Sequence, residues 1–541
     1  MKHYFSLTLL ATAVLAGCAT TSITPTDVTN GYNSIQADEL AKHVKVLASD
    51  EFGGRAPSSP GEKLTLDYLT AQFKALGLEP GNGDSYLQEV PLVSLEADAN
   101  MVLSIGGKDY QYKKDMVMGS SRISAQEGIE NSELVFVGYG VNAPEYNWND
   151  YEGLDVKGKT VVMLVNDPGF ATKDPALFTG DAMTYYGRWT YKYEEASRQG
   201  AAGAIIIHET APASYPWSVV ENSWSGEQFG FQKENNNMDR VAVEGWVTTD
   251  VAKELFTKAG LDFDTAKENA AKGAYHVDMG DLTASVNVKN TIKKSVSYNF
   301  IATLPGSEQP DEHVIYSAHW DHLGTDKTRK GDQIYNGAHD NATGTAGLIE
   351  VAEAFTKLPK HPSRSMTFLA VTAEEQGLLG SKYYAANPVI AANKTVANIN
   401  MDSLNLLGKV KDMNVVGIGK SQMDEFLATA AKEQGRTISG DPKPSSGGYY
   451  RSDHFAFANM GIPAMYAGGG TVAADEETAN YRKRMSLVLR GCYHQPCDRY
   501  RDEWDLSGAV QDLQLFYKVG FDISEQEQWP TWNASSEFQR K

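Results

Sequence analysis

The middle of the chain contains three short apolar runs, and each run stops at side chains that can bind metal ions. The runs are residues 313–318, 366–372 and 396–401. The residues that follow them are His319, the adjacent pair Glu374 and Glu375, and Asp402. Short apolar runs separated by stretches with helical periodicity are typical of buried parallel strands joined by crossover helices. The pattern predicts an α/β domain with a mixed, mostly parallel central sheet flanked by helices.

The carboxyl ends of parallel strands meet at one edge of a sheet, so these side chains are expected to converge. A further segment, 336–344, brings Asp340 just before a predicted helix. Taken singly, each acidic residue is more often a helix cap or a solvated loop residue than a metal ligand. Together, imidazole and carboxylate groups are the ligand set of zinc and similar ions, and two such ions need about five protein ligands, one of them bridging. The sequence therefore predicts a two-metal site.

The segments before this region differ in their periodicity. Residues 37–76 have helical periodicity that is interrupted at 58–61, and we expect this part to pack under the catalytic sheet. From about residue 100 to 281 the pattern changes to short strands and turns. Residues 299–306 resume the first pattern as a strand, predicted to lie beside the strand that carries His319. The expected domains are a first catalytic part at 37–100, a β-rich insertion at 101–285 and a second catalytic part at 286–530.

The N-terminus has the features of an export signal. Residues 1–17 combine a short basic start with an apolar stretch too short to span a bilayer. The ending Leu15-Ala-Gly-Cys18 resembles the bacterial lipobox, which implies lipidation of Cys18; an ordinary signal peptide with an incidental cysteine is the alternative. Ala19 after the cysteine favours the outer membrane. Residues 18–36 would then be a flexible tether, and the protein an exported lipoprotein facing the periplasm or the cell surface.

Composition sets outer limits on these interpretations. The length of 541 residues suggests two or three domains, and 41% hydrophobic with 22% charged residues is an ordinary globular balance. The net charge of −20 argues against nucleic acid and anionic lipid headgroups as partners. Membrane association is therefore expected only through the N-terminal lipid anchor.

Several blocks in the second half resemble the signature of the co-catalytic di-zinc aminopeptidases, the family that also contains glutamate carboxypeptidase II, transferrin receptor and glutaminyl cyclase. The blocks are Ala318-His-Trp-Asp-His322, Gly337-Ala-His-Asp-Asn-Ala-Thr-Gly344, Ala373-Glu-Glu-Gln-Gly-Leu-Leu-Gly-Ser381, Asn400-Met-Asp402 and Ser452-Asp-His454. They occur in the same order and context as in the family. The resemblance implies two Zn²⁺ ions per chain and a peptide substrate.

Carried over to this sequence, the family pattern assigns a role to each strand-end residue. His319 and Asp402 would belong to different metals, with Asp340 bridging them. Glu375 would ligate one metal, and its neighbour Glu374 would be the general base. Because consecutive residues of a regular strand face opposite ways, these two roles also require a turn at this point.

The fifth ligand has two candidates, His454 and His494. The family block whose histidine is a ligand resembles the surroundings of His494, which read Cys492-Tyr-His-Gln-Pro-Cys-Asp498. The resemblance therefore assigns His494 as the ligand, and His454 would support the ligands from outside or have a structural role. His339, beside Asp340, departs from the family pattern and leaves the surroundings of the bridging carboxylate open.

Other residues are given supporting roles. Asp321, two residues after His319, is expected to accept the other ring N–H of that histidine, with a helix cap as the alternative. Cys492 and Cys497 form a disulfide or remain two buried thiols. Loops at 447–454 and 467–470 line the substrate pocket in the family. Candidate pocket residues are Tyr449, Tyr450, Arg451 and Phe455, and core packing is the alternative for the aromatic ones.

The insertion looks like a protease-associated domain, which implies that it shades the active site or binds substrate, and a bystander domain is the alternative. The predicted function is a zinc-dependent exopeptidase that removes N-terminal residues, with Glu374 as general base and Asp321 supporting His319. The rivals are a carboxypeptidase or a glutaminyl cyclase on the same fold, and an inactive binding homologue. The binding homologue is the weaker rival, because all the expected ligands are present.

Overall fold

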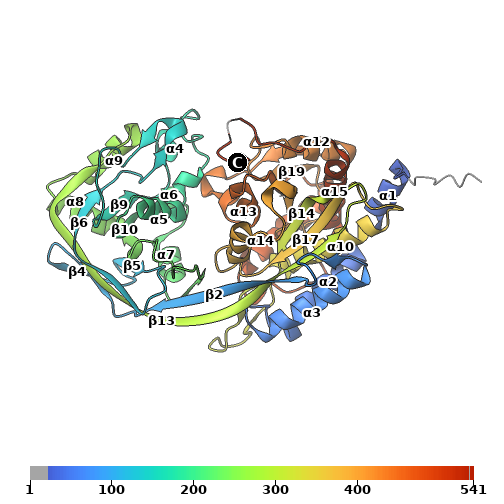
Figure 1. Cartoon of the computed structure of the whole chain (residues 1–541), viewed down its shortest axis with the longest axis horizontal. Coiled ribbons are helices and arrows are strands. Elements are labelled where there is room, and N and C mark those ends of the chain that lie inside the picture. Colours follow the sequence, from blue (N-terminus) through green and yellow to red (C-terminus); the bar gives the residue numbers. More distant parts are fainter. Residues whose placement is uncertain (1–21, 535, 541) are drawn as a thin grey trace, which may run out of the picture.

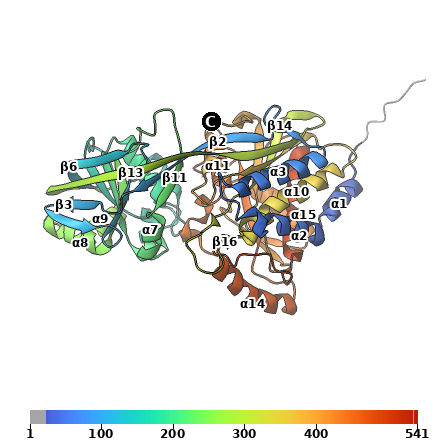
Figure 2. The same ribbon diagram turned by 90° about the horizontal axis from the view of Figure 1, so that it is seen from below.

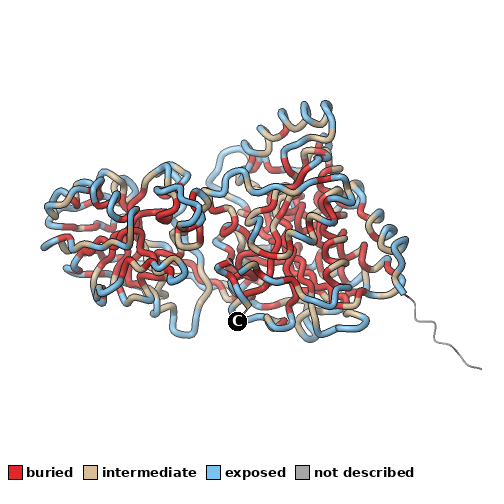
Figure 3. The backbone as a smooth tube through the Cα atoms, turned by 90° about the horizontal axis from the view of Figure 1, so that it is seen from above, coloured by how far each residue is buried: buried red, intermediate tan, exposed pale blue. Residues whose placement is uncertain are grey.

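The computed structural model of the chain describes residues 22–534 and 536–540, and it has two lobes joined by two long strands (Figure 1). The larger lobe contains the N-terminal helices and the second half of the chain. The smaller lobe is built from the middle of the chain. Each lobe has its own buried interior (Figure 3).

The core of the larger lobe is the predicted mixed sheet. Its central strands β17 (Arg364–Val371), β14 (Gln309–His319), β18 (Thr395–Asn400) and β21 (Ala464–Gly469) are adjacent and parallel. Every residue of β17 is buried, as its continuous apolar run predicts. The short strands β19 (Asp412–Val415) and β20 (Thr437–Gly440) extend the sheet beyond β21. The predicted fold class is confirmed.

Helices cover both faces of this sheet. The helices of one face are α1 (Pro25–Ser34), α2 (Ala37–Leu47), α3 (Pro60–Ala75), α10 (Thr343–Thr356) and α15 (Ser507–Glu525), which pack in one apolar cluster. The other face carries α11 (Leu379–Ala386) and α13 (His454–Asn459). Helix α12 (Met423–Glu433) packs against α15, and α14 (Glu476–Cys492) protrudes from the lobe (Figure 2).

Two expectations about the larger lobe are wrong. The flexible tether was expected to extend to residue 36, but Thr24 and Asp27 form a reciprocal capping box that starts α1, which packs on α10 and α15. The strand at 299–306 does not lie beside the strand of His319. It is the end of β13 (Val277–Leu304), which pairs antiparallel with β17, and β17 separates it from β14.

The smaller lobe combines a short parallel sheet with helices. Its parallel strands are β6 (Gln126–Phe136), β9 (Thr160–Leu164), β10 (Gly203–His208) and β12 (Val243–Thr248), and β5 (Met116–Gly119) adds an antiparallel edge. Helices α5 (Trp189–Arg198), α8 (Thr249–Lys258) and α9 (Phe263–Lys272) belong to this lobe. The remaining elements include β3 (Val102–Ile105), β4 (Lys108–Gln111), α4 (Pro168–Thr172), α6 (Thr210–Ala213) and α7 (Trp217–Ser223).

The lobes share one continuous strand. The first half of β13 pairs with β6 of the smaller lobe, and the second half pairs with β2 (Leu87–Ala97) and β17 of the larger lobe. Strand β11 (Glu227–Phe231), from the smaller lobe, pairs with the other edge of β2. The boundary expected at residue 285 therefore falls inside a strand, because no turn residues mark the passage from one lobe to the other.

Candidate metal centre

The site lies at the carboxyl ends of the central parallel strands. His319 is the last residue of β14, Glu374 and Glu375 follow β17, and Asp402 follows β18. Asp340 comes from the loop 338–342, directly before α10. The parallel arrangement of neighbouring strands thus brings together residues that are up to 83 positions apart, between His319 and Asp402.

Asp340 lies between two histidines and faces each with a different oxygen. Its Oδ1 is 3.2 Å from Nε2 of His319, and its Oδ2 is 3.2 Å from Nε2 of His494. Asp402 Oδ1 lies 3.5 Å from the same nitrogen of His319, whereas Glu375 Oε2 lies 3.0 Å from the nitrogen of His494. The result is two ligand groups that share one carboxylate, which is the arrangement that a bridged pair of ions requires.

The charge and hydrogen bonding of the site fit metal ions. The Nε2 atoms of His319 and His494 are buried without a hydrogen-bond partner among the described residues, although both point at carboxylates. Burial alone would lower the pKa of His494, but Asp340 and Glu375 outweigh it and raise the pKa to about 10. The carboxylates of this site therefore need positive charge close by, which bound metal ions would supply. Nitrogen and carboxylate donors at these separations match the preferences of zinc, and two of the groups that can hold an ion are His319 with Asp340 and Asp402, and His322 with Asp340 and Glu375.

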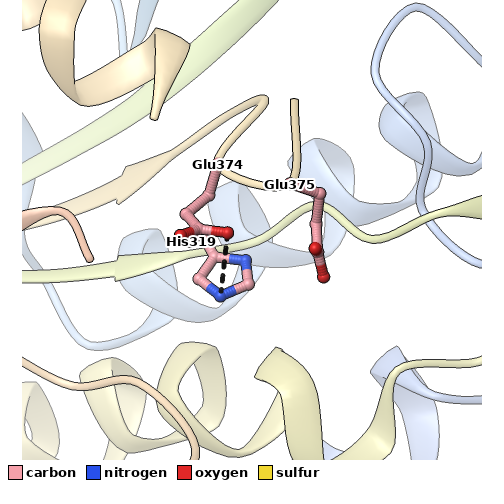
Figure 4. A group of neighbouring side chains, drawn as sticks. All are labelled: His319, Glu374 and Glu375. Atoms are coloured by element: carbon pink, nitrogen blue, oxygen red, sulfur yellow. Dashed lines mark ion pairs between the residues drawn. The ribbon is translucent and has the colours of Figure 1, made fainter. Parts of the chain in front are cut away.

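Glu374 is next to the ligands but faces them from another direction. Its Oε2 is 4.0 Å from Nε2 of His319, while Glu375 points away along a separate line (Figure 4). The expected turn between the two glutamates and their strand is present: Ala373 has a positive φ of 52°, and the carbonyl of Glu374 accepts the N–H groups of Gly377 and Leu378. Burial and the surrounding carboxylates raise the pKa of Glu374 well above its ordinary value.

Asp321 does not hold His319 in the expected way. The ring Nδ1 of His319 faces the backbone carbonyl of Asp321 at 3.2 Å, whereas the nearest carboxylate oxygen is 3.9 Å away. The carboxylate instead accepts the backbone N–H groups of Glu374 and Glu375, at 3.0 and 3.4 Å. Asp321 therefore orients the turn of the two glutamates with its side chain and the histidine with its main chain.

His322 belongs to the site, although no role was predicted for it. Its Nδ1 lies 2.5 Å from Oε1 of Glu375, so it contacts the oxygen that His494 leaves free. The signal was present in the sequence, since His322 ends the same block as His319. His339 faces elsewhere: its ring contacts the carbonyl of Leu404 at 3.2 Å.

The segment that carries His494 is held at both ends. A disulfide joins Cys492 and Cys497 around it, so the disulfide alternative is the one present in the structure. His494 itself has a left-handed backbone with φ of 54°. Directly after the disulfide, the buried carboxylate of Asp498 accepts the backbone N–H groups of His339 and Asp340 at 3.0 and 3.1 Å. One short loop therefore positions both His494 and the bridging residue.

His454, the other candidate for the fifth ligand, is outside the cluster. It is fully buried at the start of α13, between the rings of Tyr449 and Tyr466. Burial lowers its pKa to about 3. The structure brings His494, and not His454, to the carboxylates.

The aromatic candidates for the pocket wall are buried instead. Tyr449, Tyr450 and Phe455 are each at most 6% exposed and pack with Trp532 and Phe538. This is the core-packing alternative, and the reason is that the C-terminal segment covers them. Arg451 is exposed. Residues 467–469 of the second expected loop form the end of β21.

Comparison with known proteins agrees with the site. Residues 299–517 match the profile of Peptidase family M28. This segment of the chain is therefore similar to the peptidases of family M28. An aminopeptidase of Pseudomonas aeruginosa is 23% identical over 86% of this chain and 76% of its own length. Leupeptin-inactivating enzyme 1 of Streptomyces exfoliatus is 25% identical over 44% of this chain, and the match spans 50% of that enzyme.

Among solved structures, an aminopeptidase from Aneurinibacillus sp. strain AM-1 has the same fold. It aligns with 95% of this chain and 100% of its own length, with a TM-score of 0.51 and 19% identity. The M28 match begins at the end of β13 and reaches into α15, so it includes all five expected ligands and Glu374. Most of the smaller lobe lies before it.

Proposed function

We propose that this protein is a two-zinc aminopeptidase that releases one N-terminal residue at a time from unblocked peptides. The observation that carries the proposal is the bridging position of Asp340, with one oxygen toward His319 and Asp402 and the other toward His494 and Glu375. The similarity to the M28 aminopeptidases supports the same activity.

Each residue has a task that follows from its position. His319 and Asp402 would hold one ion, His494 and Glu375 the other, and Asp340 both. Two bound divalent ions would supply Lewis acidity, which polarises the scissile carbonyl and makes water more acidic. Glu374, close to the cluster and not needed as a ligand, takes the proton from that water and delivers it to the nitrogen of the leaving amine.

Recognition of the free amine explains why cleavage would occur only at the N-terminus. The site presents an excess of carboxylates, and a free α-amine next to the scissile carbonyl can pair with one of them. Acetylation removes that charge and leaves a carboxylate unpaired, with a penalty on the order of 1–3 kcal/mol. An aromatic pocket wall at 449–455 would favour apolar N-terminal residues, but these aromatic side chains are buried, so no side-chain preference is proposed.

Matched peptides with free and N-acetylated termini test the proposal by mass spectrometry. We expect stepwise loss of N-terminal residues from the free form only. Equal cleavage of both forms, or trimming from the carboxyl end, would favour the carboxypeptidase rival. Zinc content separates the cyclase rival, which uses one ion per chain, from a two-zinc peptidase. An inactive homologue would cleave neither peptide.

We further propose that the protein is an exported lipoprotein, anchored through Cys18 to the outer membrane. The support is the lipobox-like sequence, since residues 1–21 lie outside the described part of the structure. Across the residues that the structure describes, no helix is long and apolar enough to cross a membrane. Fractionation of cells that express Cys18→Ser tests this proposal: the variant should leave the membrane fraction, and its retention after a salt wash would refute the anchor.

A further inference from the structure

Three cationic side chains near the site have no acidic partner, in a protein with a net charge of −20. They are Arg188 of the smaller lobe and Lys382 and Arg451 of the larger lobe. Within the described residues, none of them has a carboxylate within the 4.0 Å of an ion pair. The nearby Arg240, by contrast, is paired with Glu244 at 3.1 Å. In a protein rich in carboxylates, unpaired cations at one place call for an external anion.

Contacts between the lobes bring Arg188 to the catalytic side. The N–H of Met183 donates to the carbonyl of Pro444 at 3.2 Å, and the ring of Tyr185 packs on Tyr450 and Phe455, with centroids 5.8 and 5.0 Å away. A Cβ atom placed on Gly447 would lie 3.4 Å from Cδ of Arg188. The stem of Arg188 therefore lies on the loop that leads to Arg451, and its Nε is buried without a hydrogen-bond partner in the described part of the chain.

Arg451 and Lys382 connect this place to the catalytic residues. Arg451 precedes Ser452, whose hydroxyl donates to Oδ2 of Asp402 at 2.7 Å. The Cα atoms of the consecutive residues Arg451 and Ser452 are only about 3.8 Å apart. The backbone of Arg451 therefore lies close to the metal site. Lys382 Nζ donates to the carbonyl of Gly377 at 2.8 Å, and the N–H of Gly377 donates to the carbonyl of Glu374.

Arg188 also interacts electrostatically with each of the other two cations. Burial and the charge of Arg451 lower the pKa of Arg188 to about 10. Burial lowers the pKa of Lys382 too, helped by Arg188 and Arg240, while Glu194 and Glu374 oppose the shift. Glu194 accepts the hydroxyl of Tyr185 at 2.7 Å, so a tyrosine already engages it. Arg188 therefore repels both Arg451 and Lys382, and an anion placed among them would relieve this repulsion.

We propose that Arg188, Arg451 and Lys382 bind a carboxylate of the substrate on the leaving side of the scissile bond, namely the C-terminal carboxylate of a short peptide. The proposal rests on the aminopeptidase function above. The N-terminal end of a peptide is a cation and belongs at the carboxylate-rich site, so the terminal carboxylate is the anion that every short peptide offers. The planar guanidinium group of arginine can donate two parallel hydrogen bonds to one carboxylate. Because Arg188 belongs to the smaller lobe, that lobe would contribute to substrate specificity.

The test compares three substrates: the dipeptide Leu-Ala, its amide Leu-Ala-NH₂, and Leu-Glu-NH₂. We expect kcat/KM for Leu-Ala to exceed that for Leu-Ala-NH₂ by about 10-fold to 100-fold, the usual effect of a charged hydrogen bond, and mainly through KM. Arg188→Gln and Arg451→Gln should each bring this ratio toward 1, and Arg188→Lys should keep part of it. The control is Arg198→Gln at the far end of α5, the helix that Arg188 precedes; its guanidinium pairs with Glu195, and the variant should keep the wild-type ratio.

Other outcomes would overturn the proposal. Equal kcat/KM for the acid and the amide in the wild type would do so, as would a preference that survives in the Arg188→Gln, Arg451→Gln double variant. If Leu-Glu-NH₂ is favoured over Leu-Ala-NH₂ while the free acid has no advantage, the carboxylate comes from a side chain and the C-terminal assignment is wrong. Cleavage of Leu-Ala-NH₂ by the wild type keeps the aminopeptidase proposal whatever the ratio, and cleavage of none of the three defeats both.

Discussion

Asp498 supports Asp340 from behind the metal site, with its Oδ2 3.1 Å from the backbone nitrogen of Asp340. Its other oxygen accepts the N–H of His339, and the Asp498 side chain itself is buried. The carboxylate that bridges the two ligand groups therefore depends on a residue that does not face them. Groups that orient metal ligands in this way commonly change metal affinity by 10-fold to 100-fold when they are lost, as a rough guide.

Asp498→Asn should weaken zinc binding by about that factor, because the amide keeps one acceptor and turns an N–H donor toward a backbone N–H. Competition with a chelator of known affinity measures the change. Asp155→Asn is a matched control, since Asp155 also accepts a backbone N–H but is exposed in the smaller lobe. Unchanged zinc affinity in Asp498→Asn would show that the loop 338–342 holds its shape without this carboxylate.

Glu374→Gln should lower kcat by about 10²-fold or more while both zinc ions remain, because the amide cannot accept the proton of the water and is not needed as a ligand. Glu375→Gln is the paired variant and should lose zinc. Turnover and zinc content are measured on the same samples. Metal loss in Glu374→Gln with retention in Glu375→Gln would mean that the two roles are exchanged.

Removing the disulfide should loosen the segment of His494. In the double variant Cys492→Ser, Cys497→Ser, chain entropy predicts a loss of about 2 kcal/mol of stability. The left-handed backbone of His494 also loses its brace, so zinc affinity should fall. A reductant should reproduce both effects in the wild type and add nothing in the variant. Equal zinc affinity with and without reductant would show that Asp498 and the metals suffice to order this loop.

The stability of the larger lobe should depend on pH through Glu350, which lies buried on α10 with its Oε1 3.6 Å from Nε2 of His43. Burial raises its pKa from 4.5 to about 8, helped by the charge of Glu353. The folded protein therefore holds a proton that the unfolded chain releases above pH 4.5. Stability is full below that pH and falls as the pH rises through about 8. The other ionisable groups around it are Glu39, Lys42 and Tyr68.

Glu350→Gln should remove this dependence and stabilise the protein at pH 8.5 by an amount on the order of 2–4 kcal/mol. Urea unfolding at pH 5, 7 and 8.5 measures it. Glu268→Gln is the control, because Glu268 is exposed on α9. A wild-type stability that increases from pH 5 to 8.5, with no difference in Glu350→Gln, would contradict the assignment.

Much of the site could be predicted because its signals are local. Each ligand from the sheet follows an apolar run, and parallel strand ends converge for reasons that hold in any such sheet, so His319, Glu375 and Asp402 were placed together without coordinates. The turn at Ala373 followed from two adjacent glutamates with different tasks. His322 was missed because a second histidine in one block looks redundant until Glu375 is seen between it and His494.

What could not be predicted depends on contacts between distant segments. Tyr449 and Tyr450 have the sequence of a loop, and only the return of the C-terminal segment near Phe538 decides that they are core. The position of Arg188 beside the catalytic lobe could not be predicted, because it depends on a contact with Gly447 in that lobe. In the same way, the sequence predicted only the last part of β13 as a separate strand at 299–306. Its continuation into the smaller lobe depends on its pairing with β2 and β6.

The continuous course of β13 has a mechanical consequence. A swinging lid needs a flexible joint, whereas here β13 runs from one lobe into the other with paired strands along it: β6 in the smaller lobe, then β2, with β11 on the far edge of β2. A rotation of the lobes would have to bend three strands together. The junction therefore resists bending more than a single unpaired linker would, because bending it would strain the backbone hydrogen bonds that join these strands.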